Sequence, residues 1–351
     1  MGVLRAVLAI LLVATLGGCS SLRYAAHVAR GEAGLLAQRE SIERVIADPR
    51  TDARTRTRLR EAQAARAFAS DHLALPRNRS YTQFVALDRP YVSWSVFATP
   101  EFSVDPVVHC FPFAGCVAYR GWFERALAER DAAQLAQQGD DVSIEGVAAF
   151  STLGWFADPI VSSMLRGDAD SLDGVIFHEL AHQMFYLAGD TAFNESYASF
   201  VEREGLREWR LSRGEAAPDT QGDERDAQFA RLVLDLRERL RALYASTRDV
   251  EALRAGKVRE FDAFRARYAT LRDGEWHGEA RYDAWVARPL DNARLVPFGL
   301  YDTWVPAFAA LFEQAGKDWP RFHALVRELG GSPEAERARR LAALSEQKAS
   351  H

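Results

Sequence analysis

A chain of 351 residues, 48% hydrophobic and 26% charged, is long enough for a large core and has the composition of a globular protein. Its formal net charge is −5, with Lys and Arg spread along the chain, which argues against the basic stripe of a nucleic-acid binder. We therefore expect no nucleic-acid partner.

The N-terminal segment has the pattern of a secretion signal. Arg5 precedes an apolar stretch, Ala6–Leu16, that is too short to cross a bilayer as a mature helix. The stretch ends at Gly17-Gly18-Cys19, which resembles a bacterial lipobox. We expect residues 1–18 to be a lipoprotein signal peptide and Cys19 the lipidated start of a domain over 19–351. Alternatives are an ordinary signal peptide cut near Gly18 and an uncleaved anchor.

With no Asp after Cys19, the signal for inner-membrane retention is absent. The expected location is therefore the bacterial cell envelope, lipid-anchored in the outer membrane and facing the periplasm.

The first half of the mature chain is predicted to be helical, then β-rich, then helical again. Residues 22–75 carry apolar residues at helical spacing, with a break at Asp48-Pro49. Residues 80–123 combine aromatic and β-branched residues with prolines, which predicts short strands. A helix over 124–138 and a strand from Val142 to Phe150 follow.

The second half predicts long helices. Residues 172–210 have the pattern of two helices joined by a tight turn. The charge-rich stretch 225–272 predicts a long helical hairpin with 214–222 as its loop, so we treat 205–272 as a helical hairpin insertion. Aromatic residues over 282–313 lead into another helix.

Two cysteines, Cys110 and Cys116, lie close together after His109. In an oxidising periplasm such a pair predicts a small disulfide loop. The alternative is a metal site that includes His109, but it lacks a fourth ligand and the usual cysteine spacing.

The run His178-Glu-Leu-Ala-His182 carries the chemistry. Two histidines four apart on a helix share a face and can converge on one zinc ion. Glu179 is rotated away from the ligands and can act as a general base toward a zinc-activated water. The residues around the run are apolar almost all round, which indicates a buried helix whose polar groups need partners.

Geometry predicts the third ligand. If the first helix runs to about Leu187, Gly189 suits its end and Asp190 or Thr191 caps a second, antiparallel helix. About four residues into that helix, Glu195 returns to the level of the histidines. We predict a site of two His and one Glu; Asp190 is the rival ligand.

The segment Phe193-Asn-Glu-Ser-Tyr-Ala-Ser-Phe-Val-Glu202 resembles the Asn-Glu-Gly-Phe-Ala segment of the gluzincin aminopeptidases, which supplies their glutamate ligand. The connection from His182 to Glu195 is shorter here, so it must be a minimal turn. The chain more closely resembles proteobacterial lipoproteins described as predicted aminopeptidases. That likeness rests on the two helices and on three further stretches, Gly115–Phe123, Phe150–Phe156 and Asn292–Leu295.

Substrate contacts are expected before the motif. Peptidases of this class bind the substrate backbone along an edge strand, and Ser151, Thr152 and Gly154 offer groups for this if 147–155 is that strand. An ordinary strand and turn packed on the helix is an equal alternative. Glu145 is a candidate for a substrate amino group.

Other residues are candidates for supporting roles. Tyr301 is the expected oxyanion donor, with Tyr119 and His277 as competitors. Asn194 and Glu202 are expected to orient the ligands.

Together these features predict a mainly helical α+β protein, with zincin-like helices, a small sheet and a long helical hairpin. The expected function is zinc-dependent hydrolysis of peptides or proteins, as an aminopeptidase by resemblance. An envelope endopeptidase is one alternative; a non-catalytic zinc lipoprotein that binds a partner through its hairpin is another.

Overall fold

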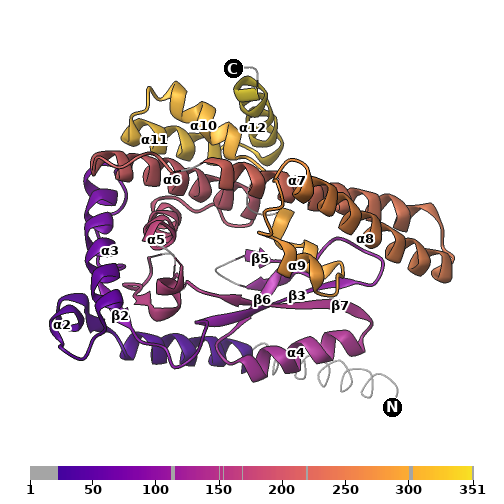
Figure 1. Cartoon of the computed structure of the whole chain (residues 1–351), viewed down its shortest axis with the longest axis horizontal. Coiled ribbons are helices and arrows are strands. Elements are labelled where there is room, and N and C mark those ends of the chain that lie inside the picture. The colour runs from indigo at the N-terminus through magenta and orange to yellow at the C-terminus, as the bar shows by residue number, and fades with distance from the viewer. Residues whose placement is uncertain are drawn as a thin grey trace, which may run out of the picture.

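A computed structural model describes residues 23–111, 115–149, 151–152, 154–167, 169–218, 220–299 and 303–349. Its mainly helical α+β architecture confirms the predicted fold class (Figure 1). The predicted signal peptide and Cys19 lie outside these residues. Within them, no helix combines the length and the apolar character needed to cross a membrane.

Helices frame the β-structure (Figure 1). A helix over 23–37 and α2 (Ile42–Ala47) come first, and α2 ends just before the predicted break at Asp48. Helix α3 (Ala53–Asp71) then packs on α5 (Ala169–Met184).

The strands form three small sheets. In the first, β1 (Glu40–Ser41) pairs with β2 (Gln83–Val85), which pairs in parallel with β8 (Ile160–Val161). The second has the antiparallel order β6 (Tyr119–Trp122), β3 (Ser93–Pro100), β7 (Asp140–Val147). The predicted strand from Val142 therefore ends earlier than expected, at Val147.

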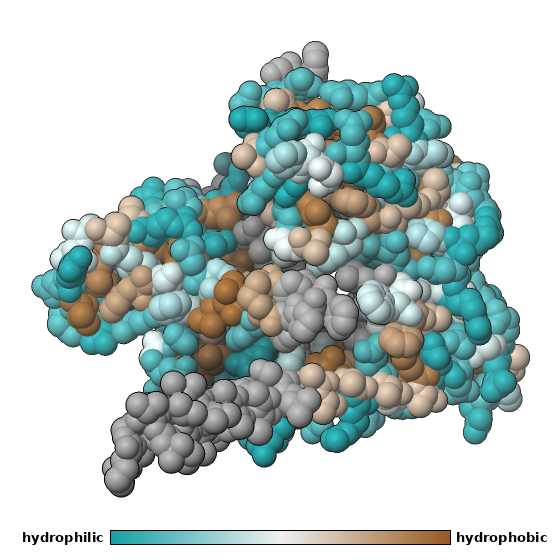
Figure 2. Space-filling view, turned by 180° about the vertical axis from the view of Figure 1, so that it is seen from behind, coloured by the Kyte–Doolittle hydropathy of each residue, from teal (hydrophilic) through white to brown (hydrophobic). Residues whose placement is uncertain are grey.

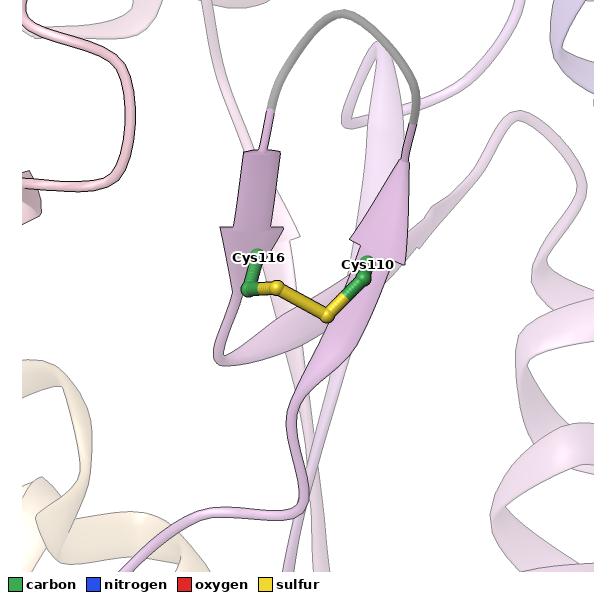
Figure 3. Close-up of a disulfide and its surroundings, with 2 residues drawn as sticks. All are labelled: Cys110 and Cys116. Atoms are coloured by element: carbon green, nitrogen blue, oxygen red, sulfur yellow. A yellow bond between two sulfur atoms is a disulfide. The ribbon is translucent and has the colours of Figure 1, made fainter.

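A two-stranded hairpin carries the predicted disulfide. Strand β4 (His109–Phe111) pairs with β5 (Gly115–Val117), and Cys110 lies directly opposite Cys116. The two sulfurs are bonded (Figure 3). The alternative metal site with His109 is therefore wrong, because both thiols are used in the bridge.

The sheet β6-β3-β7 has two different faces. Trp94, Val96 and Ala98 of β3 pack against α4 (Arg125–Gln137) on one face. Strand alternation sends Phe97 to the other face, where it contacts Tyr119 and the short helix η2 (Ala293–Leu295).

Helix α5 lies in the main core between α3 and α6 (Thr191–Ser212) (Figure 1). Helices α10 (Val305–Gln314), α11 (Trp319–Gly330) and α12 (Glu334–Ala349) form the C-terminal part. Their aromatic residues pack on α6 through Phe200, Phe312 and Phe322.

The helical hairpin consists of α7 (Thr220–Ser246) and α8 (Val250–Asp273), followed by α9 (Asp283–Ala287). Its tight turn lies at 247–249, so the prediction of 214–222 as its loop was wrong; that stretch connects α6 to α7. Helix α6 extends to Ser212, so the hairpin begins at Thr220 and not at 205. Seen from behind, the hairpin and the C-terminal helices present mainly hydrophilic residues, and hydrophobic residues gather toward the middle of that face (Figure 2).

Candidate metal centre

Helix α5 presents the two histidines of the motif side by side. The rings of His178 and His182 are 4.8 Å apart, and their Nε2 atoms are separated by 3.1 Å. The helix is held in place by the fully buried side chains of Ile176, Phe177 and Leu180. The same residues that anchor α5 in the core therefore fix the direction in which its histidines point.

The turn between α5 and α6 is held by Asn194. Helix α5 ends at Met184, three residues before the predicted Leu187. The reason is that Asn194 takes both backbone groups of Leu187: its Nδ2 donates to the Leu187 carbonyl and its Oδ1 accepts from the Leu187 N–H, each at 2.7 Å. Gly189 then turns the chain at a φ of +86°.

Asp190 caps α6, as the sequence predicted. Its carboxylate accepts from the Phe193 N–H at 3.0 Å and pairs with the buried Arg337 of α12 at 2.8 Å. Both carboxylate oxygens thus have protein partners, which explains why Asp190 is absent from the metal-ligand cluster.

Glu195 faces the two histidines from α6. Its Oε2 lies 3.3 Å from His178 Nε2 and 3.7 Å from His182 Nε2, so the three atoms form a nearly equilateral triangle. Ligand atoms about 2.0–2.2 Å from a tetrahedral zinc lie roughly 3.3–3.6 Å from one another. The three side chains therefore fit a zinc ion in both donor chemistry and spacing.

The side chains of the cluster shift one another's pKa values. Burial alone raises the pKa of Glu195, but hydrogen bonds from His178 and His182 outweigh it and bring the pKa to about 2. Burial lowers the pKa of His178, while Glu195 and Glu202 raise it well above its usual value. Without a metal, the ionised Glu195 carboxylate therefore favours a protonated His178, and a zinc ion would displace that proton when it binds.

Glu202 orients His178. The His178 Nδ1–H donates to Glu202 Oε2 at 2.9 Å, which leaves Nε2 to face Glu195. Gly174 makes room for this contact, because a Cβ at that position would lie only 3.1 Å from Glu202 Oε1. Glu202 and Asn194 were both predicted to orient the metal ligands. Glu202 contacts the ligand His178 directly, whereas Asn194 holds the turn between α5 and α6.

Glu179 lies on α5 between the two histidines and is half-buried. In the described part of the chain its carboxylate makes no salt bridge or side-chain hydrogen bond. Asp158, which is fully buried, and Tyr81 are among its electrostatic neighbours. Burial is the main cause that raises the pKa of Asp158 to about 6.

Two tyrosines lie close to the cluster. Burial, with Glu195, Tyr186 and Glu179 as neighbouring charges, raises the pKa of Tyr119 to about 12. The Tyr186 ring centre is 6.2 Å from that of His182. Tyr119 was one of the predicted oxyanion donors. The favoured one, Tyr301, lies outside the described residues, and the other, His277, follows α8 beside the hairpin core.

The segment before the motif is a loop. No described residue of 148–159 belongs to a strand, so the predicted edge strand over 147–155 was wrong there. Thr152 uses its N–H and hydroxyl to donate to Asp158 at 3.1 and 2.7 Å, which explains the folded-back path. Gly154 approaches Gln183 of α5, at a φ of +83°. Ser151 lies near Tyr81.

Glu145 lies on β7, opposite Ser95 of β3 and on the sheet face shared with Phe97. Its carboxylate accepts from Ser143 at 2.9 Å and lies 3.6 Å from Arg288. Its carboxylate thus already has a cationic neighbour, and its predicted contact with a substrate amine stays a prediction.

Sequence reasoning missed Tyr81, Asp158 and Gln183. Gln183 Nε2 donates to Asp158 at 3.2 Å, and the Tyr81 N–H donates to the Asp158 carbonyl at 2.6 Å. Tyr81 has a φ of +62°, and its buried hydroxyl lies beside Ser151. In the sequence, Asp158-Pro159 predicted only a turn. No local pattern indicated that Tyr81, Asp158 and Gln183 lie beside the metal centre.

A family model described as "Putative aminopeptidase" matches residues 23–341. No curated protein and no solved structure shows significant similarity to the chain. The matched span includes every residue of the metal-ligand cluster.

Proposed function

We propose that this chain, which belongs to the family described as "Putative aminopeptidase", is a zinc-dependent peptidase. One observation carries the proposal: His178, His182 and Glu195 converge with zinc-compatible spacing, and Glu179 lies between the two histidines on the same helix. The family description supports a peptidase; the donor set supports the metal.

The three side chains of the cluster would hold the ion through His178 Nε2, His182 Nε2 and a Glu195 oxygen. A bound zinc supplies Lewis acidity and brings the pKa of a water toward neutrality. Among the described residues the cluster has three protein ligands, which would leave a position for water or substrate, as in catalytic rather than structural zinc sites.

Glu179 is the proposed general base. Its carboxylate accepts a proton from the water that attacks the peptide carbonyl and then passes it to the departing amine. The carboxylate is half-buried beside the two histidines and makes no salt bridge among the described residues, so no ion pair holds it away from the attacking water.

Tyr119 is the proposed donor to the oxyanion of the tetrahedral intermediate. Its hydroxyl is kept protonated by a pKa raised to about 12, and Glu195, Tyr186 and Glu179 are among its electrostatic neighbours. A neutral donor aimed at the developing charge strengthens as that charge forms.

We propose aminopeptidase activity, with an envelope endopeptidase as the alternative. A non-catalytic zinc protein is less well supported, because Glu179 has no structural partner among the described residues. Paired peptides of one sequence, with free and acetylated N-termini, separate the first two. An aminopeptidase cleaves only the free form, whereas equal cleavage of both forms points to an endopeptidase.

Metal dependence is tested on the same peptides. Dialysis against a chelator is expected to abolish hydrolysis, and one equivalent of zinc is expected to restore it. Full activity in protein shown by elemental analysis to contain no metal would reject the proposal.

We also propose that the protein is lipid-anchored through Cys19 in the outer membrane, facing the periplasm. The Cys110–Cys116 disulfide supports an oxidising compartment. Palmitate labelling of cells that express the wild type and Cys19→Ser tests this: label is expected only in the wild type.

A further inference from the structure

A loop beside α5, residues 151–152 and 154–158, exposes two large aromatic side chains; we call it the aromatic loop. Trp155 is 73% exposed and Phe156 52%, the highest values for any aromatic residue in the described part of the chain. Single exposed apolar residues are ordinary on protein surfaces, so exposure alone assigns no role. The hydrogen bonds that hold the loop, and its position beside α5, indicate a role for it.

The loop backbone is fixed by hydrogen bonds. The Asp158 carboxylate accepts from the Thr152 N–H and hydroxyl, and the Phe156 N–H donates to Thr152 Oγ1 at 3.0 Å. From outside the loop, Arg39 Nη1 donates to the Ala157 carbonyl at 2.9 Å. Because the backbone is held on both sides of Trp155, the two rings are presented at a defined place.

The loop is attached to α5 close to the proposed base. Gln183, which donates to Asp158 at 3.2 Å, follows His182 directly and lies one helical turn beyond Glu179. Gly154 packs so closely on α5 that an added Cβ would be 3.3 Å from Gln183 Cγ. The aromatic loop therefore packs on α5 at Gln183, one helical turn from Glu179.

The size of the exposed surface indicates what binds it. The two rings together expose roughly 300 Å² if each side chain offers about 150–250 Å² in full. A specific protein partner needs about 800 Å² on each side. The aromatic surface is too small for a second copy of the chain but suits one or two peptide side chains.

We propose that the aromatic loop binds a large apolar side chain of the peptide substrate close to the scissile bond. The enzyme would then prefer peptides with Leu or Phe at that position over peptides with Gly. This inference rests on the proposed peptidase function, because it assigns a substrate class to that same site.

The kinetic test uses two peptides that differ only by Leu or Gly beside the scissile bond. Trp155→Ser and Phe156→Ser are expected to lower kcat/KM for the Leu peptide about tenfold or more and to change it less than twofold for the Gly peptide. Val258→Ser, which removes a 60% exposed apolar residue from the distant hairpin, is the matched control and should change neither value. Equal losses on both peptides would overturn the proposal.

A binding test separates this inference from the proposed function. In Glu179→Gln, the Leu peptide is expected to bind about tenfold more tightly than the Gly peptide, and adding Trp155→Ser should remove that preference. This result would uphold the aromatic loop even if the wild type hydrolysed no peptide. If Trp155→Ser instead left peptide preference intact and weakened binding to phosphatidylethanolamine–phosphatidylglycerol vesicles, the loop would be a membrane contact and the proposal wrong.

Discussion

The contact between Glu202 and His178 gives a quantitative prediction for metal affinity. Glu202→Leu removes the acceptor of the His178 Nδ1–H, a hydrogen bond of 2.9 Å. A hydrogen bond to a charged group contributes about 1.5–3 kcal/mol. The Glu202 side chain is 35% exposed, so solvent screening reduces this to about 1–2 kcal/mol. We therefore expect the zinc dissociation constant to rise about 5- to 30-fold.

The assay is competition for zinc with a chromogenic chelator at fixed pH. Glu204→Leu is the matched control, because Glu204 lies on the same helix but pairs with Arg207 and not with a histidine. Gly174→Ala perturbs the same contact without removing the carboxylate, since the added Cβ would lie 3.1 Å from Glu202 Oε1. Unchanged affinity in Glu202→Leu, or an equal loss in Glu204→Leu, would refute the reasoning.

Three further predictions concern other parts of the molecule. Tyr119→Phe should lower kcat about 100-fold or more with little change in zinc content, and activity within twofold of the wild type would contradict its role. Asp190→Ala, which removes the α6 cap and the pair with Arg337, should cost about 2 kcal/mol in urea unfolding, whereas Asp190→Asn should cost less than half of that and keep the metal. Burial lowers the pKa of His323 to about 4, below the ordinary value near 6.5 of the unfolded chain, so between these values the unfolded state binds the extra proton. The free energy of unfolding that depends on neutral His323 is fully present above pH 6.5 and falls by about 3 kcal/mol by pH 4. In urea titrations, His323→Gln should flatten this dependence of unfolding free energy on pH. An unchanged dependence would contradict the prediction.

The metal centre could be predicted because its residues are close in sequence and follow local rules. The apolar surroundings of the motif indicated burial, Gly189 and Asp190 marked a turn and a cap, and helix geometry then located Glu195. These positions depend on helical repeat and capping alone, which the sequence displays directly. The end of α5 was missed because it depends on Asn194, a residue from the next helix.

Contacts between distant segments could not be predicted. The hairpin turn at 247–249 contains neither Gly nor Pro, whereas the stretch 214–222 contains both, so the breaker residues pointed to the wrong place. The link between Tyr81 and Asp158 joins two loops far apart in the chain. It depends on how the sheets and helices pack, which no local pattern records.

The most direct test measures zinc content and peptide hydrolysis in the same samples of the wild type and Glu179→Gln. We predict about one zinc per chain in both proteins, because Glu179 is not a ligand, and a loss of hydrolysis of about 100-fold or more in the variant alone. Wild-type protein without zinc, or a Glu179→Gln variant that hydrolyses the free-amine peptide at the wild-type rate, would contradict the account.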